Sequence, residues 1–176
     1  MVLLIGTKGV GTNTLRKNWL NDGGFSDLNY KLTIGVNFAG KTLELPNCNV
    51  VKLLIHDINL SKHWSRIREL MYKPTFGAII LYDLTNKDSL ANLEIWCQEI
   101  RESTGDIPIL LVGNKCDLPE EQEVSAEYVL QLKEKYHLSG TMEISAKTGE
   151  DVEKMFMELT KLISTSKNIE FEKKKK

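Results

Sequence analysis

The sequence predicts a single α/β domain with three layers, in which a mainly parallel sheet carries helices on both faces. Short apolar runs bounded by Gly, Pro, Asn or Asp are typical of strands buried on both sides, and such runs cover residues 2–5, 78–82 and 109–112. Stretches with apolar residues at helical spacing alternate with them, which favours right-handed crossovers. The length of 176 residues and the mass of 20.0 kDa fit one such domain.

Two further runs are predicted to pair as a hairpin. Residues 37–45 and 49–56 flank a short turn around Pro46 and Asn47. We expect one of these strands to lie antiparallel at the edge of the sheet.

The second half of the chain contains three amphipathic helical patterns. We expect the first to be capped at Asp88 or Ser89, the second to start from Ser125, and the third to follow Asp151. Their apolar positions are Leu90, Leu93, Ile95, Trp96 and Ile100; Tyr128, Val129, Leu132 and Tyr136; and Val152, Met155, Phe156, Leu159, Leu162 and Ile163.

Composition and charge exclude several classes of protein. Lys and Arg total 23 against 24 Asp and Glu, a net charge of −1, whereas a generic nucleic-acid-binding protein needs a basic excess. Cys48, Cys97 and Cys116 lack zinc-like spacing and do not suggest a disulfide framework, so we expect a reduced, intracellular compartment. The apolar runs are too short to span a bilayer, and the N-terminus lacks the basic region of a signal peptide.

A glycine-rich loop, Gly6-Thr7-Lys8-Gly9-Val10-Gly11-Thr12-Asn13-Thr14, follows the first strand. The phosphate-loop pattern is G-x-x-x-x-G-K-[ST], and its backbone N–H groups cradle phosphate at a helix N-terminus. Thr12 stands in place of the lysine and Asn13 in place of the Mg²⁺-binding hydroxyl. Loss of the lysine alone should weaken phosphate binding about 10- to 100-fold. Lys8 either swings toward the phosphates to restore the charge or is a surface lysine.

Two motifs in the second half are more specific. They are Gly113-Asn114-Lys115-Cys116-Asp117-Leu118 and Glu143-Ile144-Ser145-Ala146-Lys147-Thr148-Gly149. With these motifs, residues 2 to about 163 resemble a Ras-superfamily small GTPase, and within it the Rab branch. The resemblance implies a P-loop NTPase G domain with a six-stranded sheet and one antiparallel edge strand. It also implies GTP or GDP and Mg²⁺ as ligands, although Mg²⁺ binding is expected to be weak or absent.

The resemblance assigns a role to each part of the base site. Asp117 accepts hydrogen bonds from guanine, Asn114 ties the loop together, and Lys115 lies along the ring. Ser145, Ala146 and Lys147 supply a backbone N–H to the base and brace Asp117, while Phe25 covers the other ring face. The implied nucleotide-binding set is Gly6, Gly9, Val10, Gly11, Thr12, Asn13, Thr14, Phe25, Thr33, Asn114, Lys115, Asp117, Leu118, Ser145, Ala146 and Lys147.

The two switch segments are unequally preserved. Segment 31–38 resembles the first switch, whose threonine is Thr33 here, and the implied Mg²⁺ ligands are Asn13, Thr33 and Asp57. In the second switch the family pattern W-D-T-A-G-Q is replaced by His56-Asp57-Ile58-Asn59-Leu60-Ser61. Leu60 replaces a glycine and Ser61 replaces the glutamine that orients water, so no catalytic residue is assigned. His63 is either a substitute base or a surface histidine.

These observations predict an atypical Rab-like protein that binds GTP or GDP with weakened phosphate and Mg²⁺ contacts, hydrolyses little GTP and regulates vesicle traffic. Two alternatives remain open: a nucleotide-independent scaffold, and an active GTPase rescued by Lys8 or a partner's side chain. We expect a cytoplasmic monomer that binds no nucleic acid and meets effector proteins through Phe38, Trp64 and Tyr72.

The predicted boundaries are residues 1–166 for the domain and 167–176 for a polar, lysine-rich tail. The family usually ends in prenylated cysteines, yet none follows Cys116, so the chain is either truncated or not prenylated. The terminal lysines either solubilise the protein or attach it peripherally to endomembranes.

Overall fold

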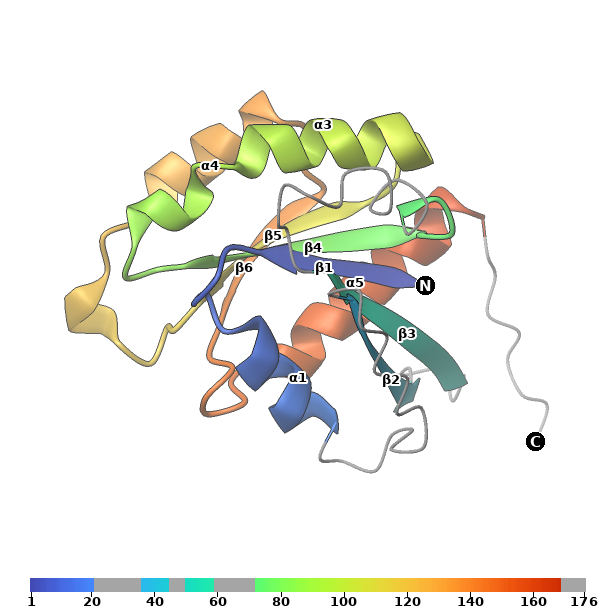
Figure 1. Ribbon diagram of the computed structural model, residues 1–176, viewed down its shortest axis with the longest axis horizontal. Coiled ribbons are helices and arrows are strands. Elements are labelled where there is room, and N and C mark those ends of the chain that lie inside the picture. Colours follow the sequence, from blue (N-terminus) through green and yellow to red (C-terminus); the bar gives the residue numbers. More distant parts are fainter. Residues whose placement is uncertain (21–35, 45–49, 59–71, 169–176) are drawn as a thin grey trace.

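The structure is a computed structural model that describes residues 1–20, 36–44, 50–58 and 72–168 (Figure 1). Its described sheet has six strands in the order β2-β3-β1-β4-β5-β6, and only the β2–β3 pair is antiparallel. The elements are β1 Val2–Gly6, α1 Thr12–Leu20, β2 Val36–Glu44, β3 Val50–Ile58, β4 Gly77–Asp83, α3 Leu93–Thr104, β5 Ile109–Asn114, α4 Ala126–Lys135, β6 Gly140–Ile144 and α5 Val152–Ser166, with short 3₁₀ turns η2 Lys87–Leu90 and η3 Pro119–Glu121. The predicted fold class is confirmed.

The sheet is covered on both faces. Helices α3 and α4 lie on one face and α1 and α5 on the other (Figure 1). Alternate residues of β1 enter different cores, since Leu3 packs with the α3/α4 layer and Leu4 with the α1/α5 layer. Burial on both faces explains why β1, β4 and β5 appear in the sequence as continuous apolar runs.

The hairpin also forms as predicted. The two strands pair from Val36 opposite Ile58 to Glu44 opposite Val50, with β2 at the sheet edge. The turn predicted around Pro46 and Asn47 lies outside the described residues.

Helix starts agree with the sequence in one case and differ in another. The Ser125 side chain caps α4 by accepting the Tyr128 N–H, as expected. The cap predicted at Asp88 or Ser89 is wrong, because Asn86 caps the η2 turn there and α3 starts only at Leu93. Ser89 is instead buried, and its hydroxyl donates a hydrogen bond to the backbone carbonyl of Asn86.

One residue of the predicted apolar stripe of α3, Ile95, faces solvent instead of the sheet. Ile95 is 53% exposed, whereas Leu93, Trp96 and Ile100 are buried against the sheet. At 3.6 residues per turn, the position two after Leu93 falls on the opposite side of the helix.

None of the helices in the described part of the chain has the length and apolar character needed to span a membrane.

Candidate nucleotide-binding site

The predicted motifs meet at the carboxyl ends of the parallel strands. A cleft of about 250 Å³ opens there, and carboxyl ends of strands are where open α/β sheets bind ligands. Its lining consists of Gly9, Gly11, Thr14, Asn114, Lys115, Asp117, Leu118, Ala146 and Lys147. A larger hollow of about 420 Å³ runs between β6 and α5, but it is lined by none of the predicted site residues.

The glycine loop joins β1 to α1 in the conformation that its glycines permit. Gly9 and Gly11 have φ angles of 97° and 101°, in the left-handed region that favours glycine. A Cβ on Gly11 would collide with the Asn114 side-chain amide, whereas a Cβ on Gly9 would meet nothing within 4 Å. Val10 is buried in the core, so only its backbone is available to the site.

Asn114 joins three segments of the site. Its side-chain Nδ2 donates to the Val10 carbonyl at 2.7 Å, and its Oδ1 accepts the Ala146 N–H at 2.8 Å. The residue is only 3% exposed, so these bonds are shielded from water. A backbone N–H of the Ser145–Lys147 segment was predicted to reach guanine. The Ala146 N–H already has a partner in Asn114, so a base that used this group would have to share or replace that bond.

The Asp117 carboxylate is contacted by two residues of the Ser-Ala-Lys loop, Ser145 and Lys147. Its Oδ1 accepts the Ser145 hydroxyl at 2.6 Å, and Lys147 Nζ lies 3.8 Å from Oδ2. Ser145 is fully buried and its Oγ also accepts the Thr148 N–H at 3.0 Å. The hydroxyl thus acts as donor to Asp117 and as acceptor from Thr148, and these two bonds together orient the carboxylate.

Lys115 is oriented by a residue that the sequence analysis missed. Its Nζ lies 2.5 Å from Asp83 Oδ2, and Asp83 also accepts the N–H and hydroxyl of Thr85 at 2.9 and 2.7 Å. Burial alone would raise the pKa of Asp83, but the hydrogen bonds from Lys115 and Thr85 outweigh it and hold the pKa below its usual value. The position of Asp83 could have indicated its role in the site, because Asp83 ends β4 directly beside Asn114 at the end of β5.

Asn18 is a second missed residue. From α1, its side-chain Nδ2 donates to the carbonyls of Ala146 and Lys147, the latter at 3.3 Å. The first helix therefore fixes the backbone of the Ser-Ala-Lys loop. No local sequence pattern indicated this contact, since the residues lie at opposite ends of the chain.

The thiol of Cys116 contributes no charge to the cleft at neutral pH. Its Sγ lies 3.7 Å from Glu150 Oε2, and burial, followed by the charge of Glu150, raises its pKa to about 11. The raised pKa keeps the Cys116 thiol protonated at neutral pH, and a protonated thiol is a poor nucleophile.

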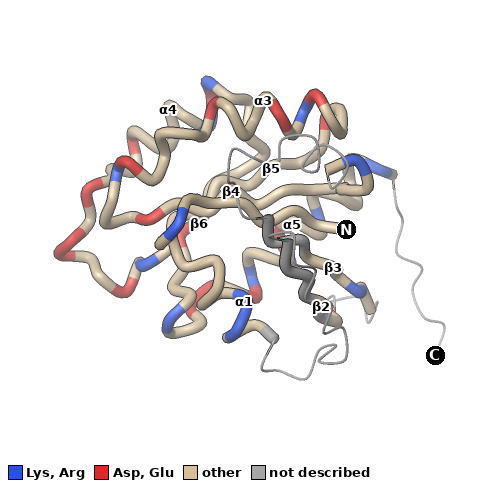
Figure 2. The backbone as a smooth tube through the Cα atoms, in the orientation of Figure 1, with Lys and Arg blue, Asp and Glu red and all other residues tan. Residues whose placement is uncertain are grey.

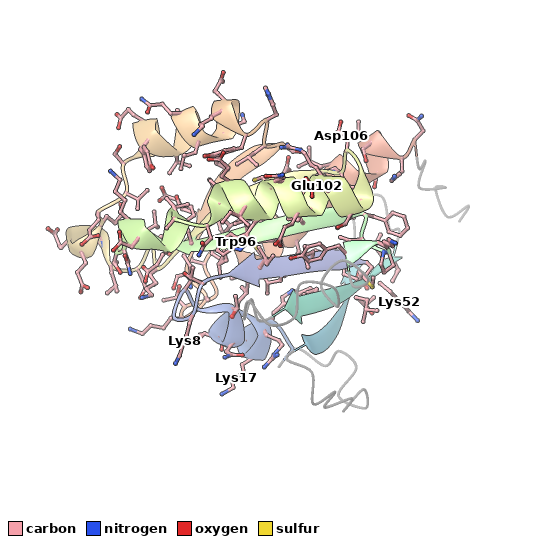
Figure 3. The ribbon with its side chains drawn as sticks, turned by 45° about the horizontal axis from the view of Figure 1, so that its top comes forward. Lys8, Lys17, Lys52, Trp96, Glu102 and Asp106 are labelled. Atoms are coloured by element: carbon pink, nitrogen blue, oxygen red, sulfur yellow. The ribbon has the colours of Figure 1, made fainter. Side chains whose placement is uncertain are left out.

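The substituted phosphate positions lie at the start of α1. Asn13 is exposed, and its Oδ1 accepts a hydrogen bond from Arg16 Nη2 at 3.1 Å. Neither Thr12 nor Asn13 lines the cleft. Lys8 is exposed on the loop and its side chain is directed away from the sheet (Figure 3).

Several predicted residues lie outside the described part of the chain. These are Phe25, Thr33, Leu60, Ser61, His63 and Trp64, together with the side chains of Phe38 and Asp57. The backbone of Asp57 lies in β3, opposite Leu4. Among the described residues, no group of three or more His, Cys, Asp or Glu side chains could hold a metal ion.

The structure corrects one predicted effector contact. Tyr72 is 1% exposed, and its hydroxyl lies 3.4 Å from Glu99 Oε2 in α3. A ring buried in the α3/α4 core has no surface to offer a partner, so its role is in packing.

A glycine loop between the first parallel strand and the first helix, within this sheet order, defines an α/β domain of the P-loop NTPase type. The sequence profile of the Ras family matches residues 1–165, and the chain belongs to that family.

Its relatives include several Rab proteins. The chain is 37% identical over 163 residues to Ras-related protein Rab-11B of Dictyostelium discoideum, covering 92% of this chain and 72% of that protein. It is 35% identical over 166 residues to GTP-binding protein YPT1 of Saccharomyces cerevisiae, covering 94% and 79% respectively. With Ras-related protein Rab-26 of Rattus norvegicus it shares 34% identity, over 91% of this chain and 62% of that protein. The resemblance to Rab-like small GTPases is thereby confirmed.

Proposed function

We infer that this protein binds GTP or GDP with weakened phosphate and Mg²⁺ contacts and hydrolyses GTP little or not at all. The observation that carries this proposal is the Asp117 carboxylate, held by Ser145 at the rim of a cleft next to a glycine loop. Guanine presents an N1–H and an exocyclic amine that one carboxylate accepts together. Adenine lacks that donor pair and would leave the acid unpaired, which is unfavourable.

The residues at the phosphate end of the site support the second part of the proposal, which is weakened phosphate and Mg²⁺ contacts and slow hydrolysis. The loop can still offer backbone N–H groups to a phosphate, as any glycine-rich loop of this kind does. However, Thr12 carries no charge where the motif has lysine. Asn13 offers an amide oxygen where a short hydroxyl would ligate Mg²⁺, and that oxygen already accepts a hydrogen bond. Ser61 is too short to orient an attacking water as a glutamine does, so slow hydrolysis is expected.

The cellular role follows from the family. Rab-like proteins regulate vesicle traffic through effectors that recognise the switch regions, and we extend that role to this chain with Phe38 and Trp64 as effector contacts. We further propose a cytoplasmic monomer whose terminal lysines allow peripheral contact with anionic membranes.

Bound nucleotide provides the first test. The purified protein is denatured and the supernatant is chromatographed; GDP or GTP near one equivalent per chain supports the proposal. Absence of nucleotide, even after loading with excess GDP in the presence and absence of Mg²⁺, would instead favour a nucleotide-independent scaffold. Multiple-turnover phosphate release that is lost in Lys8→Ala would identify an active GTPase rescued by that lysine.

A further inference from the structure

Strand β6 forms one edge of the described sheet. It pairs with β5 on one side, and no described strand lies on its other side. β5 is buried throughout, whereas Glu143 is exposed and the first three residues of β6 are half-buried. Sheet edges are commonly protected by proline, a bulge or several charges, but β6 contains no proline and Glu143 is its single charged residue. The outer side of this strand can therefore pair with an added strand.

Two hollows flank this edge on opposite faces of the sheet. The α5-side hollow, of about 420 Å³, lies between β6 and α5, and the α4-side hollow, of about 290 Å³, lies between β6 and α4. Helices α4 and α5 cover opposite faces (Figure 1), and Thr141, Met142 and Glu143 line both hollows. Because side chains alternate between the two faces of a sheet, a strand added beside β6 would send alternate side chains into the two hollows.

The α5-side hollow suits apolar side chains. Its apolar lining consists of Leu110, Met142 and Leu162. The charged groups on its α5 side already pair along the helix, since Lys154 Nζ lies 3.1 Å from Asp151 Oδ2 and Lys161 Nζ lies 3.5 Å from Glu158 Oε2. An apolar side chain entering this hollow would thus be buried without breaking an ion pair.

The α4-side hollow suits a long basic side chain. Val129 and Leu130 line it, and Leu130 is 53% exposed. The Glu143 carboxylate lies at the same hollow, and no described residue forms an ion pair with it. Acidic residues also recur along α3 and α4, whereas basic residues gather on α1 (Figure 2). A lysine or arginine can lay its methylene groups on apolar surface while its charged end reaches a carboxylate.

We propose that β6 binds an extended segment of a partner protein in which apolar residues alternate with lysine or arginine. The backbone of the segment pairs with β6, its apolar side chains enter the α5-side hollow, and its basic side chains cross Leu130 to reach Glu143. This inference goes beyond the proposed function and does not rest on it, because neither hollow is lined by a residue of the predicted nucleotide-binding set.

A synthetic peptide tests the backbone pairing. The probe is the blocked hexapeptide Val-Arg-Val-Arg-Val-Arg, titrated into the full chain by calorimetry at physiological ionic strength. Its controls are Val-Glu-Val-Glu-Val-Glu and two N-methylated probes, one methylated at every valine nitrogen and one at every arginine nitrogen. Only one edge of an added strand faces β6, so we expect one methylated probe to lose affinity at least tenfold and the other to keep it. Binding should also slow amide hydrogen exchange in residues 140–144.

Matched variants test the two side-chain contacts. Glu143→Gln should weaken the probe about two- to fivefold, whereas Glu153→Gln, an exposed site on α5 outside both hollows, should not. Leu130→Ala should weaken it about two- to tenfold. Ile95→Ala on α3 is its control, because Ile95 is equally exposed and loses the same number of carbon atoms.

Several outcomes would overturn the proposal. These are no saturable binding of the probe at millimolar concentration, equal binding of the glutamate peptide, equal affinities of the two methylated probes, and equal effects of a variant and its control. A wild-type dimer in sedimentation that Leu130→Ala dissociates would assign the edge to a second copy of the chain. A tenfold rise in probe affinity after replacement of lysines 173–176 by Gln would assign it to the chain's own tail, and either result excludes a partner segment.

Discussion

The Ser145 hydroxyl donates a 2.6 Å hydrogen bond to Asp117 Oδ1 and thereby joins the loop after β5 to the loop after β6. Ser145 is fully buried, whereas the Asp117 side chain remains 14% exposed at the cleft. The bond thus anchors a ligand-facing carboxylate to the interior of the domain. A carboxylate held in one orientation before binding loses less entropy when a base pairs with it.

Replacement of Asp117 tests base selectivity directly. Asp117→Ala removes the acceptor of two hydrogen bonds from guanine, each worth about 1.5–3 kcal/mol to a charged group, so GDP affinity should fall roughly 10²- to 10⁴-fold. The preference for GDP over ADP should disappear, as measured by competition with a fluorescent GDP. Asp106→Ala, an exposed site before β5 (Figure 3), serves as the control. A variant that keeps its guanine preference would refute the assignment of Asp117.

Removal of the anchoring hydroxyl should have a smaller effect of the same kind. Ser145→Ala leaves Asp117 in place but frees its carboxylate and leaves the Thr148 N–H without its acceptor. We expect GDP affinity to fall about tenfold and the free energy of unfolding to fall by about 1–3 kcal/mol. Urea unfolding and calorimetry measure the two effects, with the exposed Ser166→Ala as control. Unchanged affinity would mean that the Asp117 carboxylate needs no anchor.

Asp83 makes a pH-dependent contribution to stability. Its folded-state pKa is depressed, so its stabilising effect is present above the unfolded-state pKa of about 3.9 and is lost as pH falls through the lower folded-state value. Asp83→Asn should therefore unfold at lower urea concentration than wild type at pH 7. The gap between them should shrink steadily as pH falls from about 5 toward 3. A gap that stays constant over this range would show that the charge of Asp83 plays no part.

The sequence predicted the sheet better than the site. Strands such as β1 are visible because both faces are buried, and the Asp117 and Ser145 motifs are visible because the chemistry fixes their spacing. Asp83 and Asn18 were missed because their partners come from distant segments that only the folded chain brings together. The Arg16–Asn13 contact, by contrast, joins residues three apart on a helix, and its spacing could have revealed it.

Gly9 and Gly11 both have a positive φ, but only Gly11 packs closely against another side chain. Alanine substitutions at the two positions therefore separate backbone strain from steric collision. Both have positive φ, so Gly9→Ala should lower the free energy of unfolding by about 1–2 kcal/mol through backbone strain alone. Gly11→Ala adds a collision with the Asn114 amide, whose two buried hydrogen bonds join the loop to Val10 and Ala146. Its loss should reach about 2–4 kcal/mol, with GDP affinity falling as well. Any effect of the extra methyl group on the unfolded chain is the same in both variants, so equal unfolding midpoints would show that close packing at Gly11 is not required.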